Sequence, residues 1–383
     1  MWQFDFTNPV RLVFGRGKLA VVGEEAKRCG RKALIVTSGS SGRTGLLAKV
    51  VDLIKQAGVE CVVFDQVKAN PLTTMAHAGA ALAKTERCDV VVGLGGGSAM
   101  DAAKAIAFMA VNDGDVSEYI YGKPGSGALP VILITTTAGT GSEGNNVAVL
   151  TNPENNDKKG LKSPFLYAKA SIIDPELLLT LPQRAIAGPG LDAMFHAIEA
   201  YVARRSNPIT AMMALQAISW LTESLPAVYH DSSNIEAWER VSLANTLAGM
   251  AIDASGTTLA HGLEHPVSGL FDVAHGEGLA ALIVPFMEFS YSAAPEKFAM
   301  IAKIMGEEVA GLSDEQAAAK SAPAMARLLK TLGMELRLRD FGVTSANLDW
   351  LTANALKTMK ANIDNSPKVP GEAEIKEIYS KSL

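Results

Sequence analysis

Residues 90–104, with the sequence VVVGLGGGSAMDAAK, decide the fold of the first half of the chain. Three valines precede the glycine cluster Gly95–Gly97, and an alanine-rich stretch that starts at Ser98 follows it. A strand that passes through glycines into a helix leaves free backbone N–H groups at the helix start, where an anion is attracted. The stretch therefore predicts a loop that fits a pyrophosphate, with a merely tight turn as the alternative.

This glycine cluster is neither the G-x-G-x-x-G fingerprint nor a P-loop, because no Lys-Ser or Lys-Thr pair follows it at the required spacing. A second stretch, ITTTAGTGSE at residues 134–143, adds hydroxyl groups and further glycines after an apolar run. These groups are able to hydrogen-bond a ribose, a phosphate or a carboxamide, or they satisfy their own turn. Together the two stretches predict a nucleotide-binding region.

Apolar runs and helical patterns alternate through the first half, which is typical of parallel strands joined by helices. We expect the strands to be buried on both faces and the helices between them to be rich in alanine. The predicted strands are 33–36, 61–64, 90–93 and 131–134, and the predicted helices are 45–56, 73–85 and 99–110.

The strand patterns end near Gln183, and helix-forming stretches follow one another from there. Prolines at Asp174-Pro175 and Leu181-Pro182 favour a boundary in this region. Since 383 residues exceed one ordinary core, we predict an α/β dinucleotide-binding domain over residues 1–183 and a helical domain over 184–383. The predicted helices of the second domain include 191–203, 210–225, 235–252 and 315–332.

The composition excludes several classes of protein. With 48% apolar and 20% charged residues, the chain is typical of a well-packed globular protein. A net charge of −5 without a basic run argues against nucleic acid as a partner. The N-terminus, MWQFD, has no signal-peptide pattern and no apolar run spans a bilayer, so we expect a cytoplasmic protein without a membrane partner. Cys29, Cys61 and Cys88 are expected to be buried, inert thiols.

Four of the six histidines fall into two short motifs of the second half. Asp192 and His196 are four residues apart and share a helix face. His261 and His265 repeat this spacing, and His275 follows after a loop containing glycine. Each histidine alone is more often an ordinary core or surface residue, but one carboxylate and several imidazoles together suit divalent iron, zinc, nickel or cobalt. The set therefore predicts a metal site.

Three further residues, Glu199, His77 and His230, lie outside this set. Glu199 follows His196 by three residues on the same helix face. It is either an acceptor for the second nitrogen of a ligand or an ordinary exposed or paired glutamate. His77 and His230 lie outside any cluster and are expected to be ordinary residues.

With these motifs the chain resembles the iron-containing alcohol dehydrogenase family, and within it the branch of butanol dehydrogenases and aldehyde reductases. The resemblance covers nearly the whole length. It implies a Rossmann-like N-terminal domain and an all-α C-terminal domain, the fold shared with dehydroquinate synthase. The matching motifs are FGRG at 14–17, GLGGGS with Asp101 and Lys104, TTAGTGSE at 136–143, IDPEL at 173–177, residues 190–199, His261 to Pro266, and His275-Gly276.

The resemblance also implies roles for individual residues. It implies that His265 carries a proton and that a metal, Fe²⁺ in the first place and Zn²⁺ or Ni²⁺ as alternatives, is bound in the helical domain. The implied metal ligands are Asp192, His196, His261 and His275. The implied cofactor residues are Ser38, Asn70, Gly95, Gly96, Gly97, Ser98, Asp101, Thr136, Thr137, Thr140 and Lys158.

The residues after the predicted strand 33–36 bear on the choice of cofactor. Family members that prefer NAD often carry an aspartate there, which binds the ribose and repels a 2′-phosphate. This chain has Ser38-Gly39-Ser40-Ser41 instead, and such small residues leave room for a phosphate. We therefore predict NADP(H), with NAD(H) as the alternative.

The reaction implied by the resemblance is hydride transfer between a nicotinamide and a small primary alcohol or aldehyde. The metal would act as a Lewis acid and His265 would relay the proton. A maleylacetate reductase-like or glycerol dehydrogenase-like enzyme is the alternative within the fold, and a cofactor-binding sensor without turnover is the alternative outside enzymes. The family also implies a homodimer or a larger homo-oligomer, while the physiological substrate stays open.

Overall fold

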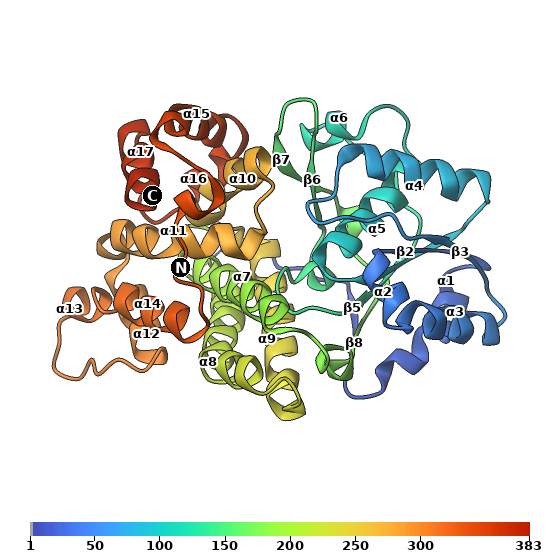
Figure 1. The fold of residues 1–383 in the computed structure, drawn as a ribbon, viewed down its shortest axis with the longest axis horizontal. Coiled ribbons are helices and arrows are strands. Elements are labelled where there is room, and N and C mark those ends of the chain that lie inside the picture. Colours follow the sequence, from blue (N-terminus) through green and yellow to red (C-terminus); the bar gives the residue numbers. More distant parts are fainter. Residues whose placement is uncertain (1–2) are drawn as a thin grey trace. The chain divides into compact units, whose positions relative to one another are not determined.

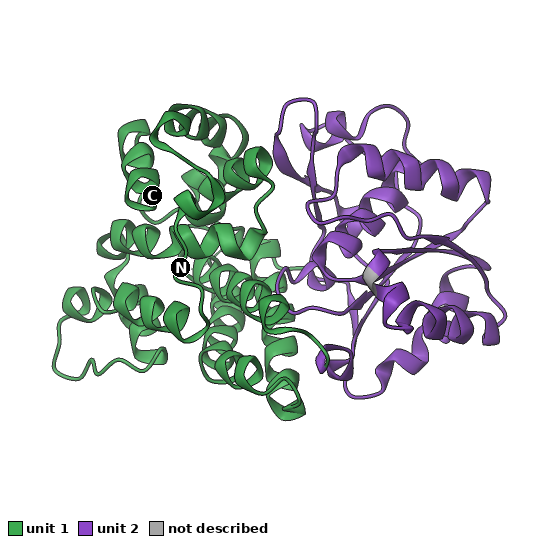
Figure 2. Ribbon diagram, viewed as in Figure 1, with its two compact units in different colours: residues 1–7, 180–383 green, residues 8–179 purple. Residues whose placement is uncertain are grey.

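The computed structural model describes residues 3–383, apart from the side chain of Ser40. It divides into two compact units, drawn in different colours in Figure 2. One unit is Asn8–Leu179, and the other is Thr180–Leu383 together with the short segment that ends at Thr7. Residues 1–2 of the predicted first domain lie outside the described residues. The assignment of one domain to the cofactor and the other to the metal and substrate stays a prediction.

The unit of residues 8–179 is built on a six-stranded parallel sheet with the order β1-β8-β5-β4-β2-β3 (Figure 1). From β2 the chain adds β3 on one side and β4 on the other, so its direction reverses between β2 and β4. Ligands of such sheets bind at the carboxyl ends of the strands beside this reversal. The strands are β1 (Arg11–Phe14), β2 (Lys32–Thr37), β3 (Glu60–Phe64), β4 (Val90–Gly95), β5 (Val131–Thr135) and β8 (Ala170–Ile173).

Helices cover both faces of this sheet, because alternate strand residues point to opposite faces and both sets are apolar. On one face Leu34 lies in a buried cluster with Ile106 of α5. On the other face Ile35 lies in a buried cluster with Ile54 of α3. The helices of this unit are α1 (Val22–Cys29), α2 (Gly39–Arg43), α3 (Leu46–Gln56), α4 (Thr73–Thr85), α5 (Gly97–Met109) and α6 (Val116–Ile120).

One predicted strand is less buried than expected. β3 lies at the edge of the sheet, and its Val63 is 37% exposed. An edge strand has a neighbouring strand on one side only. The prediction of burial on both faces was therefore wrong for β3, whereas β2, β4 and β5 are almost entirely buried.

A short antiparallel hairpin was not predicted. It consists of β6 (Val147–Thr151) and β7 (Lys158–Lys162). The residues of β7 are mainly lysines and glycine, so no apolar pattern marks it in the sequence. Its Leu161 is nevertheless buried in one cluster with Met109 of α5 and Leu166. Tertiary contacts, rather than local propensity, define this hairpin.

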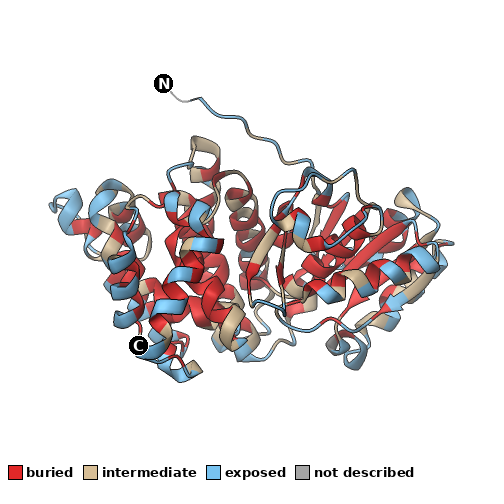
Figure 3. Ribbon diagram, turned by 90° about the horizontal axis from the view of Figure 1, so that it is seen from above, coloured by how far each residue is buried: buried red, intermediate tan, exposed pale blue. Residues whose placement is uncertain are grey.

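The unit of residues 180–383 contains helices and no strand among the residues that the structure describes, which confirms the predicted fold class. Helix α7 is buried almost continuously from Ile186 to Val202. Figure 3 shows buried residues along the helices inside this unit and exposed residues on the helices at its outside. The helices are α7 (Gln183–Val202), α8 (Pro208–His230), α9 (Ile235–Ser255), α10 (Leu259–Phe271), α11 (His275–Ser290), α12 (Pro295–Ile304), α13 (Asp314–Ala318), α14 (Ser321–Thr331), α15 (Leu348–Thr358), α16 (Lys360–Asp364) and α17 (Glu372–Lys381).

The predicted single helix over 315–332 is two helices, so that prediction was wrong. Helix α13 ends at Ala318 and α14 begins at Ser321. Pro323 stands in the first turn of α14, where its missing N–H group costs nothing. A continuous helix would place the proline ring against the carbonyl group of Ala319, which favours a break before Pro323.

The three cysteines are free, but only Cys88 is buried, while Cys29 and Cys61 are half-buried. Complete burial was therefore wrong for two of them. Partial desolvation raises the pKa of all three thiols, which keeps them protonated and unreactive at neutral pH.

No helix among residues 3–383 has both the length and the apolar character needed to cross a membrane.

Candidate active site

One face of α7 carries three of the predicted functional side chains. Asp192, His196 and Glu199 follow one another at spacings of four and three residues, which places them on one side of the helix. All three are buried. Nδ1 of His196 lies 3.6 Å from Oδ1 of Asp192. Helix α7 therefore presents a carboxylate and an imidazole together inside the unit.

Helix α10 brings His261 to the same carboxylate. Nε2 of His261 lies 3.4 Å from Oδ1 of Asp192, and its ring stacks on the ring of His196 at 4.4 Å between centroids. Nδ1 of His261 pairs with Oε2 of Glu199. The two nitrogens of this imidazole thus face two different carboxylates.

Glu199 also binds backbone groups at the start of α10. Its Oε1 accepts hydrogen bonds from the backbone N–H and the hydroxyl of Thr258, at 2.8 and 2.6 Å, and from the N–H of Ala260 at 3.1 Å. These N–H groups have no partner within the helix, so the carboxylate caps α10. Glu199 is therefore buried and paired with His261 rather than exposed, and its role beside a metal ligand stays a prediction.

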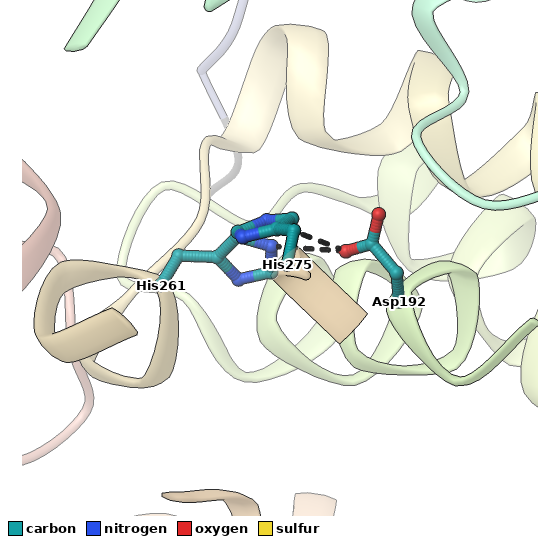
Figure 4. Close-up of side chains that lie close together, drawn as sticks. All are labelled: Asp192, His261 and His275. Carbon is teal, nitrogen blue, oxygen red and sulfur yellow. Dashed lines mark ion pairs between the residues drawn. The ribbon is translucent and has the colours of Figure 1, made fainter. Parts of the chain in front are cut away.

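His275 is the first residue of α11, and its Nε2 lies 3.6 Å from Oδ1 of Asp192. For Nε2 of His275 to lie this close to Asp192, the first turn of α11 must pack directly against α7. A Cβ atom on Gly276 would lie 2.1 Å from the carbonyl oxygen of Gly188, so only glycine permits the contact. Figure 4 shows His261 and His275 both directed at Asp192.

Four side chains from three helices therefore meet at one carboxylate oxygen. The ligand atoms of Asp192, His261 and His275 lie within 4.8 Å of one another, while His196 reaches this group through its contact with Asp192. Oδ1 of Asp192 and Nε2 of His261 are buried and have no hydrogen-bond partner among the described residues. Buried polar atoms are normally paired. A divalent cation satisfies both atoms, so the residues present fit such an ion.

The charges of this cluster depend on one another. Burial alone raises the pKa of Asp192, but His196, His275 and His261 outweigh it and lower the pKa. Burial alone lowers the pKa of His261, but Glu199 and Asp192 outweigh it and raise the pKa to about 10. In the protein without a metal ion, a proton on His261 therefore compensates the carboxylates.

His265 lies beside the cluster and is also buried. Its ring centroid is 5.5 Å from that of His275 and 6.4 Å from that of His261. Its ligand atom groups with those of Glu264 and His275 within 4.8 Å. Glu264 was not predicted as a site residue. The available signal was its position three residues after His261, which repeats the spacing of Glu199 after His196.

The predicted cofactor segments meet at the carboxyl ends of β2, β4 and β5. The hydroxyl of Thr37 donates to the carbonyl of Leu94 at 2.7 Å, which joins the end of β2 to that of β4. The N–H of Thr136 donates to the carbonyl of Gly95 at 3.0 Å, which joins β5 to β4. Ser38 directly follows Thr37. These segments lie beside the reversal of strand order, where nucleotides bind in such sheets.

The glycines of this loop have a packing role that the sequence did not reveal. A Cβ atom on Gly96 would lie 2.6 Å from Oγ1 of Thr137, and one on Gly97 would lie 2.2 Å from Cγ2 of Thr140. Gly95 also has a φ of +151°, which side chains rarely allow. Residues 136–142 (the threonine loop) therefore pack against residues 95–98 (the glycine loop), and both predicted segments lie at the start of α5.

Asp101 and Lys104 are buried inside this unit. The carboxylate of Asp101 accepts hydrogen bonds from the hydroxyl of Ser142 at 2.6 Å and the N–H of Val149 at 3.0 Å. Burial raises its pKa, although Lys104 opposes this shift. Nζ of Lys104 contacts the carbonyl oxygens of Ser142, Asn145 and Val147 and Oδ1 of Asn145 at 2.6–3.0 Å. These groups hold the threonine loop and β6 in place.

Asn70 and Lys158, two predicted cofactor residues 88 positions apart, also meet. Nζ of Lys158 donates to Oδ1 of Asn70 at 3.1 Å. Asn70 has a φ of +48°, and the neighbouring Thr151 of β6 bonds back to the carbonyl of Pro71 at 2.9 Å. The hairpin β6–β7 therefore brings Lys158 to the segment that precedes α4.

A doubly wound α/β unit and a buried cluster of aspartate and histidines define the class of nicotinamide-dependent, metal-dependent dehydrogenases. Residues 9–175 match the model of iron-containing alcohol dehydrogenases, and residues 186–383 match the C-terminal model of the Fe-containing alcohol dehydrogenase family. The chain belongs to the iron-containing alcohol dehydrogenase family, as the motifs predicted. It is an oxidoreductase that transfers hydride between a nicotinamide cofactor and an alcohol or aldehyde.

Relatives match the chain over nearly its whole length. A 1,3-propanediol dehydrogenase of Klebsiella pneumoniae is 36% identical and covers 100% of this chain and 99% of its own. A probable NADH-dependent butanol dehydrogenase of Bacillus subtilis is 33% identical and covers 93% of this chain and 94% of its own. The crystal structure of an archaeal, halo-thermophilic alcohol dehydrogenase from a Red Sea brine pool has a TM-score of 0.97 at 36% identity and covers 100% of both chains.

Proposed function

We propose that Asp192, His196, His261 and His275 hold the divalent metal ion of this enzyme. The observation that carries the proposal is the meeting of three histidines at Oδ1 of Asp192, a buried oxygen without a hydrogen-bond partner among the described residues. Iron is the first candidate because of the family, and zinc or nickel are alternatives because imidazole and carboxylate ligands accept all three. When bound, the metal supplies Lewis acidity to the oxygen of an alcohol or aldehyde.

Glu199 and His265 have separate roles in the proposed reaction. Glu199 accepts a hydrogen bond from Nδ1 of His261, which orients the ring with Nε2 toward Asp192. His265, buried beside His275, takes up the proton of the alcohol in oxidation and returns it in reduction. Imidazole suits this task because its ordinary pKa lies near neutral pH.

We propose that the loop Gly95–Ser98 binds the pyrophosphate of the cofactor. The backbone N–H groups at the start of the 13-residue helix α5 and the positive end of its dipole favour an anion there. Thr137 and Thr140 lie against this loop, Thr136 is hydrogen-bonded to Gly95 through its backbone N–H, and all three offer hydroxyl groups. Asn70 and Lys158 add an amide and an ammonium group, while Asp101 acts through the loop that it supports.

Two observations bear on the choice between NADP and NAD. Ser38 and Gly39 at the end of β2 bring no carboxylate, and a Cβ atom on Gly39 would lie 3.6 Å from Nη1 of Arg43. Small residues and a nearby guanidinium favour a 2′-phosphate. A relative is named for NADH, which favours NAD. We propose that the enzyme accepts both and prefers NADP(H).

The substrate that we propose is a small primary alcohol, diol or aldehyde. The relatives named for 1,3-propanediol and for butanol support short chains. We further propose a cytoplasmic location, supported by three free cysteines, and a homodimer or larger homo-oligomer, supported by the family.

The experiment that tests the proposed function is a panel of short alcohols and aldehydes with NADH and NADPH, on metal-free enzyme and on enzyme reloaded with iron or zinc. We expect reduction of butanal and 3-hydroxypropanal that depends on reloading. Equal rates for metal-free and reloaded enzyme would contradict the metal site, and turnover of maleylacetate in preference to short aldehydes would contradict the substrate.

A further inference from the structure

Glu264 is a fully buried glutamate of α10 that the reaction as described above does not use. Its Oε2 pairs with Nδ1 of His275, and its Oε1 accepts a hydrogen bond from the hydroxyl of Ser268. A carboxylate without exposure to water is costly unless its oxygens are paired. The contacts with His275 and Ser268 therefore offset the cost of burying the Glu264 carboxylate.

The pair of Glu264 and His275 repeats the pair of Glu199 and His261. In both, the carboxylate faces Nδ1, and Nε2 of the ring lies 3.4–3.6 Å from Oδ1 of Asp192. A carboxylate at Nδ1 holds a proton on that nitrogen, so Nε2 is the nitrogen of the ring that is available to a metal ion. The two glutamates thus prepare two imidazoles in the same way.

Ser268 further supports the pair of Glu264 and His275, because it lies between Glu264 and the loop before His275. Its hydroxyl oxygen is within hydrogen-bond distance of Glu264 and lies 3.0 Å from the carbonyl oxygen of Val273. The loop turns at Asp272, whose φ is +52°. Ser268 therefore connects the position of Glu264 to the start of α11.

Room for the carboxylate comes from Gly278 in the first turn of α11. A Cβ atom there would lie 2.8 Å from Oε1 and 3.1 Å from Cγ of Glu264. The His275 side chain is also 22% exposed, against 3% for that of His261, so packing alone restrains it less. An ion-pair partner such as Glu264 matters more for such a ring.

We propose that Glu264, supported by Ser268, is the residue that positions His275 for metal binding. This inference rests on the proposed metal site. Removal of an orienting partner of a metal ligand typically weakens metal binding about 10- to 100-fold. The effect concerns the affinity and the geometry of the site, so it is measurable without turnover.

The test is titration of metal-free enzyme with Co²⁺ against a competing chelator, with the visible absorption bands of bound Co²⁺ as a second readout. Glu264→Leu removes the acceptor, and we expect the Kd to rise about 10- to 100-fold with altered bands. Glu264→Gln keeps an amide oxygen for Nδ1 and should lose less. Ser268→Ala should weaken binding to a smaller extent, whereas Ser290→Ala, a buried serine at the far end of α11, should not.

The outcomes separate the two proposals. If the unsubstituted enzyme and Asp192→Asn bind Co²⁺ equally weakly, the proposed metal site is wrong. If the unsubstituted enzyme binds Co²⁺ tightly and Glu264→Leu matches it in Kd and absorption, the inference about Glu264 is wrong. If Glu264→Leu does not fold, the Kd values of Glu264→Gln and Ser268→Ala decide, and values equal to that of Ser290→Ala overturn the inference.

Discussion

Nε2 of His261 lies 3.4 Å from Oδ1 of Asp192, and neither atom has a hydrogen-bond partner among the residues that the structure describes. Asp192→Asn keeps the size of the side chain but removes its charge. We expect metal content after purification to fall below stoichiometric and kcat/KM to fall about a hundredfold or more. Metal analysis and steady-state kinetics check this, with circular dichroism to show that the fold persists. Full metal content in Asp192→Asn would contradict the role of Asp192.

The raised pKa of His261 predicts how the stability of the metal-free protein depends on pH. The pKa of about 10 in the folded protein lies above the value of about 6.5 for an unperturbed histidine. The contribution of His261 to stability is therefore fully present below about pH 6.5 and is lost as the pH rises through 10. Urea unfolding of the metal-free protein at pH 6, 8 and 10 should show this decline.

His261→Gln is the control for this dependence, since it removes the titrating group. Its stability should change less between pH 6 and 10 than that of the unsubstituted protein. Because a metal ion must displace the proton on His261, metal affinity should rise over the same pH interval. An identical decline in both proteins would show that another group is responsible.

His265 should matter for the reaction and not for metal binding. We expect His265→Gln to lower kcat about 10²- to 10⁴-fold, the usual contribution of a general acid or base, with unchanged metal content. The pH dependence of kcat/KM should lose the limb that reports this histidine. Retention of full kcat/KM across the pH range would rule out the role.

Cofactor preference should respond to the residue after β2. Ser38→Asp places a carboxylate where it attracts the ribose hydroxyls and repels a 2′-phosphate. We expect the ratio of kcat/KM for NADPH to that for NADH to fall about tenfold or more, which corresponds to about 1.4 kcal/mol. Arg43→Ala should lower the same ratio. An unchanged ratio in both variants would place the 2′-position elsewhere.

Lys104 should stabilise the fold and the threonine loop together. Its ammonium group is fully buried among carbonyl oxygens of Ser142, Asn145 and Val147. Lys104→Met leaves these oxygens without their charged donor, and we expect a loss of about 3–5 kcal/mol in the free energy of unfolding. Lys84→Met, a half-exposed lysine of α4, is the control and should lose less than about 1 kcal/mol. Equal losses would refute the prediction.

Local patterns were enough for the main elements of the fold. The alternation of buried strands with alanine-rich helices predicted the parallel sheet, and the predicted helix 73–85 coincides with α4. The hairpin β6–β7 was not predictable in this way, because Leu161 is buried by contact with distant residues rather than marked by a pattern. The break before Pro323 had a local signal, the proline itself, but the helical pattern on both sides concealed it.

Some residues of the candidate site were predictable from the sequence, and others were not. Asp192 and His196 belong to one helix turn, so their spacing alone predicts that they lie together. Glu264 and Glu199 repeat a spacing of three after a histidine, but this spacing alone does not tell a buried glutamate from an exposed one. Only their burial against His275 and His261 distinguishes them.

Asp192 and His261 therefore show what the sequence and the tertiary structure each contribute to the site. By itself the sequence determined the family, the two kinds of unit and the candidate ligands. These depend on residue types and on their order along the chain, because helix and strand periodicity act over a few residues. The tertiary structure decided which nitrogen of His261 and His275 faces Asp192, which glutamate holds each ring, and why residues 276 and 278 are glycines. These features depend on the packing of α7, α10 and α11, whose residues lie tens of positions apart.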